Sequence, residues 1–140
     1  MKKTKAISII LAVVMLFSLV SISVFADSWT TSGSLGSFSS NGTLIMRSSF
    51  ATTEAYAYNN SLSAQTIRVN TQCVVEYDDG EVDIDFTDYG DESVPKRGST
   101  SASAAVNIRG VVSAIYAEFY FLQNGADETL GIDIERGTDF

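Results

Sequence analysis

The segment QTIRVNTQCVVEYDDGEVDIDF, residues 65–86, determines the fold class of this chain. Apolar or small side chains alternate with polar ones from Ile67 to Tyr77, with Val74 the one exception, and the alternation resumes from Val82 to Phe86. A period of two is typical of a strand with one buried face. Asp79-Gly80 lies between the two runs, and Asp-Gly between alternating segments is a strong hairpin signal. The sequence therefore predicts one long hairpin over residues 64–86.

The same alternation recurs along most of the chain. It predicts further strands over residues 43–49, 52–58, 100–108 and 112–122, and a short last strand marked by Leu130, Ile132 and Ile134. Turns are expected at Ser40-Asn41-Gly42, Asn59-Asn60-Ser61, Arg109-Gly110 and Asn124-Gly125, and residues 88–98 as the longest irregular loop. Seven or eight strands at this spacing favour an all-β fold, a single antiparallel β-sandwich or, as the alternative, a small barrel.

The N-terminal residues 1–26 have the pattern of a cleaved signal peptide. Three lysines, at positions 2, 3 and 5, precede an almost wholly apolar run over residues 6–20, and Val24-Phe25-Ala26 fits the small-x-small cleavage rule. An uncleaved membrane anchor is the alternative, which the short apolar run disfavours. We expect a secreted bacterial protein that is released into the medium or loosely associated with the wall, without stable membrane insertion after cleavage. Residues 27–40 form a Ser/Gly-rich arm or edge strand, and residues 41–140 the sandwich domain.

Composition excludes several classes of function. The chain has 9 basic and 17 acidic residues, a net charge of −8, and removal of the three leader lysines makes the net charge −11. Nucleic acid and anionic lipid are therefore poor partners. The chain has no His, which excludes a His-based triad and His metal ligands. Its one cysteine, Cys73, is expected to be an inert buried thiol.

An acidic block stands out between residues 76 and 92, which hold 9 of the 17 acids. Because Ca²⁺ takes several carboxylate oxygens, a weak Ca²⁺ site is one hypothesis. It would lie between the turn 78–81 and the loop 88–92, with Asp78, Asp79, Glu81, Asp88, Asp91 and Glu92 as ligands. The spacing lacks the EF-hand pattern. The alternative is a solvated hairpin whose charges resist edge-to-edge aggregation, and no other cofactor is expected.

Two carboxylates flanking a bond are all that a glycosidase needs. Glu76 with Asp83 or Asp85, or Glu118, would be the candidates. A domain this small has little room for a deep cleft, and no nucleophile motif or phosphate loop is present. We therefore expect a protein that is not an enzyme.

Four tyrosines are the candidate binding residues: Tyr56, Tyr58, Tyr116 and Tyr120. They occupy alternating positions of two expected strands, and would form an exposed aromatic platform if those strands shared one sheet face. The alternative is that they cover the sheet with their hydroxyls in water. Trp29 either docks an N-terminal strand or marks a partner contact. These features favour a secreted, non-catalytic interaction module at or outside the bacterial cell envelope, with a wall or extracellular protein or glycan as partner.

The stretch GSTSASAAV, residues 98–106, followed by AEFYF, residues 117–121, resembles the C-terminal half of small secreted β-sandwich proteins of Gram-positive bacteria. The lactococcin-type bacteriocins are the characterised members. The resemblance covers about a quarter of the chain, which is longer and more acidic than those peptides. It implies a secreted antagonist of competing bacteria as an alternative function and assigns no residue a role. A third alternative is a self-associating matrix component to which residues 28–40 donate a strand.

Overall fold

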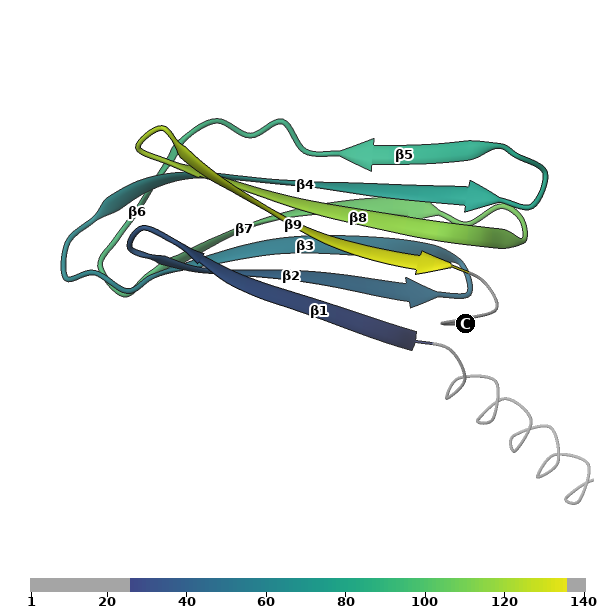
Figure 1. Ribbon diagram of the computed structural model, residues 1–140, viewed down its shortest axis with the longest axis horizontal. Coiled ribbons are helices and arrows are strands. Elements are labelled where there is room, and N and C mark those ends of the chain that lie inside the picture. Colours follow the sequence, from purple (N-terminus) through teal and green to yellow (C-terminus); the bar gives the residue numbers. More distant parts are fainter. Residues whose placement is uncertain (1–25, 136–140) are drawn as a thin grey trace, which may run out of the picture.

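The computed structural model describes residues 26–135, and all its regular elements are β-strands. Two antiparallel sheets pack face to face (Figure 1), as the sequence predicts. The first sheet has the order β1-β2-β3-β7, and the second has the order β5-β4-β8-β9 with β6 paired to β4. The strands are β1 Ala26–Leu35, β2 Phe38–Arg47, β3 Phe50–Asn59, β4 Gln65–Tyr77, β5 Val82–Phe86, β6 Glu92–Val94, β7 Ser99–Asn107, β8 Val112–Gln123 and β9 Ala126–Glu135.

The predicted hairpin is present as β4 and β5, which pair from Gln72↔Phe86 to Glu76↔Val82. Gly80 in its turn has φ +84°, a backbone region that glycine enters without steric cost. The predicted Asn124-Gly125 turn joins β8 to β9, and both residues have positive φ, as the common two-residue hairpin turn requires. The short-range turn chemistry therefore fixes both hairpins of the second sheet.

Residues 26–135 contain nine strands rather than the expected seven or eight, because strands form in the N-terminal arm and in the segment expected to be an irregular loop. The N-terminal arm forms β1, an edge strand that pairs with β2 along its whole length. The expected irregular segment 88–98 contains the short β6. Most of the predicted signal peptide lies outside the described residues, as do the last five residues of the chain. Within the described range no helix is long and apolar enough to cross a membrane.

The turn predicted at Ser40-Asn41-Gly42 is wrong, since these residues lie in the middle of β2. Gly42 pairs with Thr31 of β1 and Ala55 of β3. A Cβ atom on Gly42 would lie 2.2 Å from a ring carbon of Phe119, which approaches from the other sheet. The glycine is therefore explained by close packing between the sheets and not by a turn.

The core lies between the two sheets and combines small residues on one side with large ones on the other. The inward positions of β3 and β7 are mostly alanine, whereas β4 and β8 contribute larger apolar side chains. Alanine opposite phenylalanine lets the sheets interdigitate at native density. The largest fully buried apolar side chains are Phe38, Leu44, Ile67, Val75, Val94, Ile115, Phe119 and Phe121. This core leaves the outward side chains of each sheet free to form a surface.

Candidate functional site

The four candidate tyrosines do not form one platform. Tyr56 and Tyr58 are outward residues of β3, in the first sheet, and Tyr116 and Tyr120 are outward residues of β8, in the second. Because the two sheets pack through their inner faces, the two pairs of rings lie on opposite sides of the molecule. The pair on β8 lies beside surface hollows and among exposed apolar and acidic side chains, so it is the better candidate for a binding site.

The outward side chains of β5, β4, β8 and β9 make up a surface that we call the outer face of the second sheet. The register of the three strand pairings places Ile84, Val74, Tyr116 and Asp133 in one row across it. The neighbouring row consists of Phe86, Gln72, Glu118 and Gly131. Exposed apolar side chains thus alternate with amide and carboxylate groups, which is a mixture suited to binding and not to a core.

Three of these apolar side chains are open to solvent. Ile84 is 56%, Phe86 65% and Tyr116 36% exposed. All three are large, and their rows adjoin, so they form a contiguous patch and not scattered single residues. A contiguous exposed patch on a small domain commonly marks an interaction surface.

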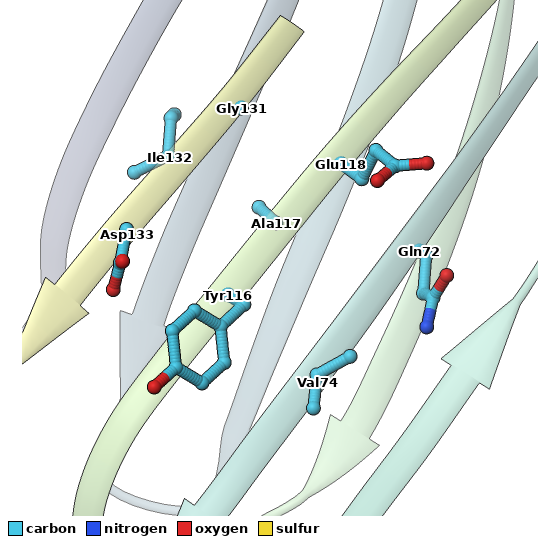
Figure 2. A pocket seen from close by; sticks show the side chains of 8 residues that line it. All are labelled: Gln72, Val74, Tyr116, Ala117, Glu118, Gly131, Ile132 and Asp133. Atoms are coloured by element: carbon cyan, nitrogen blue, oxygen red, sulfur yellow. The ribbon is translucent and has the colours of Figure 1, made fainter. Parts of the chain in front are cut away.

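A shallow hollow of about 290 Å³ lies on this face between β4, β8 and β9. Figure 2 shows the Tyr116 ring lying across the sheet at one side of it, with Asp133 and Gly131 on β9 and Glu118 further along β8. A Cβ atom on Gly131 would meet only the Ala117 carbonyl oxygen, at 3.8 Å. The missing side chain of Gly131 therefore leaves space within the hollow. Its lining consists of Gln72, Val74, Tyr116, Ala117, Glu118, Gly131, Ile132 and Asp133.

A second hollow of about 190 Å³ adjoins the first and shares Gln72 and Glu118 with it. It extends over the strands toward Phe86 and Tyr120. Asn70 also lines it, and the side-chain oxygen of Asn70 accepts a hydrogen bond from the backbone N–H of Tyr89 at 2.8 Å. The two hollows together form an open depression across the sheet, with both Tyr116 and Tyr120 on its border.

The electrostatic field on this face is negative. The pKa of Tyr116 is raised, first by its partial desolvation and then by the carboxylates of Glu76, Asp133 and Glu135. The ion pairs within residues 26–135 join Arg68 to Asp91 and Arg109 to Glu81 and Asp83, so none of them engages Glu76, Glu118 or Asp133. A ligand on this face consequently meets exposed negative charge beside an aromatic ring.

The structure does not bring together the ligands of the predicted Ca²⁺ site. Glu76 pairs with Val82 beside the turn that holds Asp78, Asp79 and Glu81, whereas Ile67 pairs with Glu92 near Asp88 and Asp91. Glu76 lies nine residues along β4 from Ile67, which corresponds to about 30 Å. Asp91 is also paired with Arg68 at 3.1 Å. Among the described residues no group of three or more His, Cys, Asp or Glu is placed to hold a metal ion.

Of the carboxylates considered for glycosidase chemistry, Glu76 and Glu118 point outward from the second sheet, whereas Asp83 and Asp85 lie on its inner side. Glu76 is opposite Val82 and points outward, whereas Asp83 and Asp85 are opposite the buried Val75 and Cys73. Asp83 and Asp85 therefore point toward the first sheet, so neither can flank a bond together with Glu76.

Asp83 instead belongs to a structural cluster. Its Oδ2 accepts hydrogen bonds from Nε of Arg109 at 2.8 Å and from the hydroxyl of Tyr77 at 2.9 Å. The bond from Arg109, followed by that from Tyr77, lowers the pKa of Asp83. The Arg109 guanidinium also lies 4.6 Å from the centre of the Tyr77 ring. The cluster ties β4 and β5 to the segment that follows β7.

The two remaining residues of interest are packed in the interior. Cys73 is fully buried, and burial, followed by the charge of Asp85, raises its pKa to about 11. A thiol with such a pKa carries almost no thiolate at neutral pH, so it is a poor nucleophile. Trp29 is partly buried and packs against the core from β1, which supports the strand-docking interpretation.

Sequence reasoning found Tyr116 and Tyr120 but missed Gln72, Phe86 and Gly131, which lie on the same face. Cross-strand register places these three residues in one row with Glu118. The alternation within a single strand does not predict which residues of the neighbouring strands lie opposite. The sequence did offer one signal for two of them. Gln72 and Phe86 both occupy outward positions of the predicted hairpin, and the hairpin pairing places them side by side.

No family model matches the chain, and no curated protein matches it. Among solved structures, the chain is similar to the Pseudomonas fluorescens alkylpurine DNA glycosylase AlkC bound to DNA containing an abasic site analog, with a TM-score of 0.38 and 9% identity. That similarity covers 61% of this chain and spans only 25% of the glycosylase chain. A structural genomics target, SoR45, has a TM-score of 0.38 and 6% identity over 81% of this chain and 86% of its own. At these levels neither structure bears on function.

Proposed function

We propose that the protein is a secreted, non-catalytic module that binds a glycan through the outer face of its second sheet, at or outside the bacterial cell envelope. The observation that carries the proposal is the exposed Tyr116 ring, which lies across the sheet beside an open hollow lined by Gln72 and Glu118 (Figure 2). The signal-peptide pattern of residues 1–26 supports secretion.

The chemistry of the face matches that of a sugar chain. A pyranose ring has an apolar C–H face that packs on an aromatic ring, and hydroxyls around its edge that hydrogen-bond with amides and carboxylates. Tyr116 and Phe86 offer the rings, and Gln72 and Glu118 between them offer the polar groups. The first hollow, at about 290 Å³, is at the low end for small-molecule pockets and is open to solvent. An open, shallow surface can accommodate one sugar residue of a polysaccharide whose neighbouring residues continue across the sheet.

The opposite outer face provides a matched control for the test. The variant Phe86→Ala/Tyr116→Ala removes two aromatic rings from the proposed face, and Tyr56→Ala/Tyr58→Ala removes two from the other. The secreted protein and both variants would be mixed with isolated Gram-positive cell walls, with insoluble chitin and with insoluble chitosan, and the bound fraction measured. Because aromatic anchors at an interface each contribute about 1 kcal/mol or more, we expect at least tenfold weaker retention for the first variant.

The control variant should be retained as the wild type is. Thermal unfolding of both variants checks that neither simply fails to fold. Equal loss in the two variants, or no retention of the wild type on any glycan, would show that the face is not a glycan-binding surface.

A further inference from the structure

We infer that the glycan bound by this face carries free amino groups, so that the ligand is a cationic amino-sugar polymer. The inference rests on the proposed function and adds the chemical class of the ligand. It is carried by the placement of carboxylates near the Tyr116 ring and by the scarcity of basic residues at the outward positions of this face within residues 26–135.

The carboxylates lie near the ring in the plane of the sheet. Asp133 is directly opposite Tyr116 on β9, and Glu118 is the next outward residue on β8. Glu76 is the next outward residue after Val74, which faces Tyr116 from β4. A sugar stacked on this ring would therefore have the carboxylates of Asp133 and Glu76 beside it, and that of Glu118 further along β8, where Figure 2 shows it directed away from the ring.

The face has little positive charge of its own to neutralise these groups. Among the described residues, the outward positions of its four strands contain one basic residue, Arg68, which lies six residues from Val74 along β4 and is paired with Asp91. The net charge of the whole chain is also negative, at −8. Charge complementarity therefore favours a cationic ligand, and the attraction extends over about 8 Å at physiological salt.

The aromatic ring and the carboxylates would act together on an ammonium group. An ammonium over the face of Tyr116 can interact with the ring electrons and with a carboxylate beside the ring, such as that of Asp133. An uncharged sugar could donate hydrogen bonds from its hydroxyls to these carboxylates but would form no ion pair with them. A uronic acid polymer or a phosphate-rich wall polymer would be repelled, and a second copy of this chain would bring like charges together. A basic peptide shares the charge, but the hollow is open and offers no enclosed pocket for a long side chain.

The test compares two glucosamine hexamers of equal length, one fully N-acetylated and one fully de-N-acetylated. Binding to the secreted protein would be measured by calorimetry at a pH at which the amines are protonated. We expect the de-N-acetylated hexamer to bind at least about tenfold more tightly, with an affinity that falls as salt is raised. The variant Glu118→Gln/Asp133→Asn should remove most of that difference and leave the weaker binding of the N-acetylated hexamer unchanged.

Two further variants make the result specific. Gly131→Leu places a side chain in the hollow, where a Cβ meets no close atom, so it should block both hexamers while the protein stays folded. Glu54→Gln removes an outward carboxylate from β3, on the opposite face, and should change nothing.

Each other outcome overturns a different statement. Equal binding of both hexamers would leave the glycan-binding function standing and refute the requirement for amines. Binding of neither hexamer, with no retention on cell walls, would refute the function itself. Equally tight binding of a lysine hexamer would show that the face selects cationic peptides and not amino sugars.

Discussion

Asp85 of β5 accepts a hydrogen bond from the backbone N–H of Ala105 in β7, at 2.8 Å, and so connects the edges of two different sheets. Among the described strands, β7 pairs with β3 alone at the edge of the first sheet, and β5 pairs with β4 alone at the edge of the second. A free strand edge exposes N–H and C=O groups that can pair with another chain. The carboxylate of Asp85 hydrogen-bonds one such N–H group, that of Ala105, and places a negative charge beside the β7 edge.

We expect Asp85→Ala to lower stability and to promote association. The loss of one hydrogen bond to a partly solvated carboxylate should cost about 1 kcal/mol in urea unfolding. The freed β7 edge should also make sedimentation depend on protein concentration. Asp88→Ala, which removes an acid from the neighbouring loop, is the control. If both variants stay monomeric at high concentration, Asp85 does not protect the edge.

Gly42 is the position where a single methyl group should be costly. A Cβ there would lie 2.2 Å from the Phe119 ring, which is itself fully buried. Gly42→Ala should therefore destabilise the protein by about 1–3 kcal/mol through overpacking. Gly131→Ala, also in a strand, should be close to neutral because its Cβ meets no close atom.

The stability cost of Gly42→Ala should fall when it is combined with Phe119→Leu, because the smaller leucine side chain leaves room for the added methyl group. Denaturant unfolding of the two single variants and the double variant measures this coupling. Additive costs would show that the ring of Phe119 is not what requires glycine at this position.

Gly42 also shows where prediction from sequence succeeds and where it stops. The hairpin over residues 64–86 and the Asn124-Gly125 turn were predicted because all their signals lie within a few residues. The role of Gly42 depends on Phe119, which is distant in sequence and belongs to the other sheet. A glycine that follows Ser-Asn has the composition of a turn until that partner is known.

The four-tyrosine platform was predicted wrongly for a related reason. Alternation correctly places Tyr56 and Tyr116 at outward positions, but it does not state which sheet each strand joins. β3 and β8 belong to different sheets, so the expected platform is divided between two faces. Sheet membership and register come from long-range pairing, which a single sequence with this pattern leaves open.

Two threonines in the core should show strong coupling. The hydroxyls of Thr53 and Thr71 lie 2.9 Å apart, and that of Thr71 is 2.9 Å from the carbonyl oxygen of Glu118. Thr53 is 0% and Thr71 3% exposed, so neither hydroxyl has water as an alternative partner. Since each hydroxyl has one proton, donation from Thr53 to Thr71 and from Thr71 to Glu118 satisfies both.

Thr71→Val should cost about 1–3 kcal/mol, because it leaves the fully buried hydroxyl of Thr53 without its partner. The double variant Thr53→Val/Thr71→Val should cost less than the sum of the two single variants, since it removes both hydroxyls. Urea unfolding of the four proteins gives the coupling. Strict additivity would contradict the hydrogen-bonded chain.

Asp83 should make stability depend on acid pH. Its hydrogen bonds from Arg109 and Tyr77 lower its pKa in the folded protein below the ordinary carboxyl value of about 4. A group with a lowered folded-state pKa stabilises the fold fully above its unfolded pKa and loses that contribution as the pH falls through the folded value. The difference in Tm between the wild type and Asp83→Asn should therefore be constant from neutral pH to about pH 5 and shrink below about pH 4.

Removing the donor provides the matched experiment. In an Arg109→Gln background, Asp83→Asn should change Tm less, because the bond that contributes most to the lowered pKa is already absent. Thermal unfolding followed by circular dichroism across the acid range gives both comparisons. A Tm difference that persists unchanged below about pH 3 would mean that the ionised carboxylate is not what stabilises the cluster, and that Asp83 contributes by packing alone.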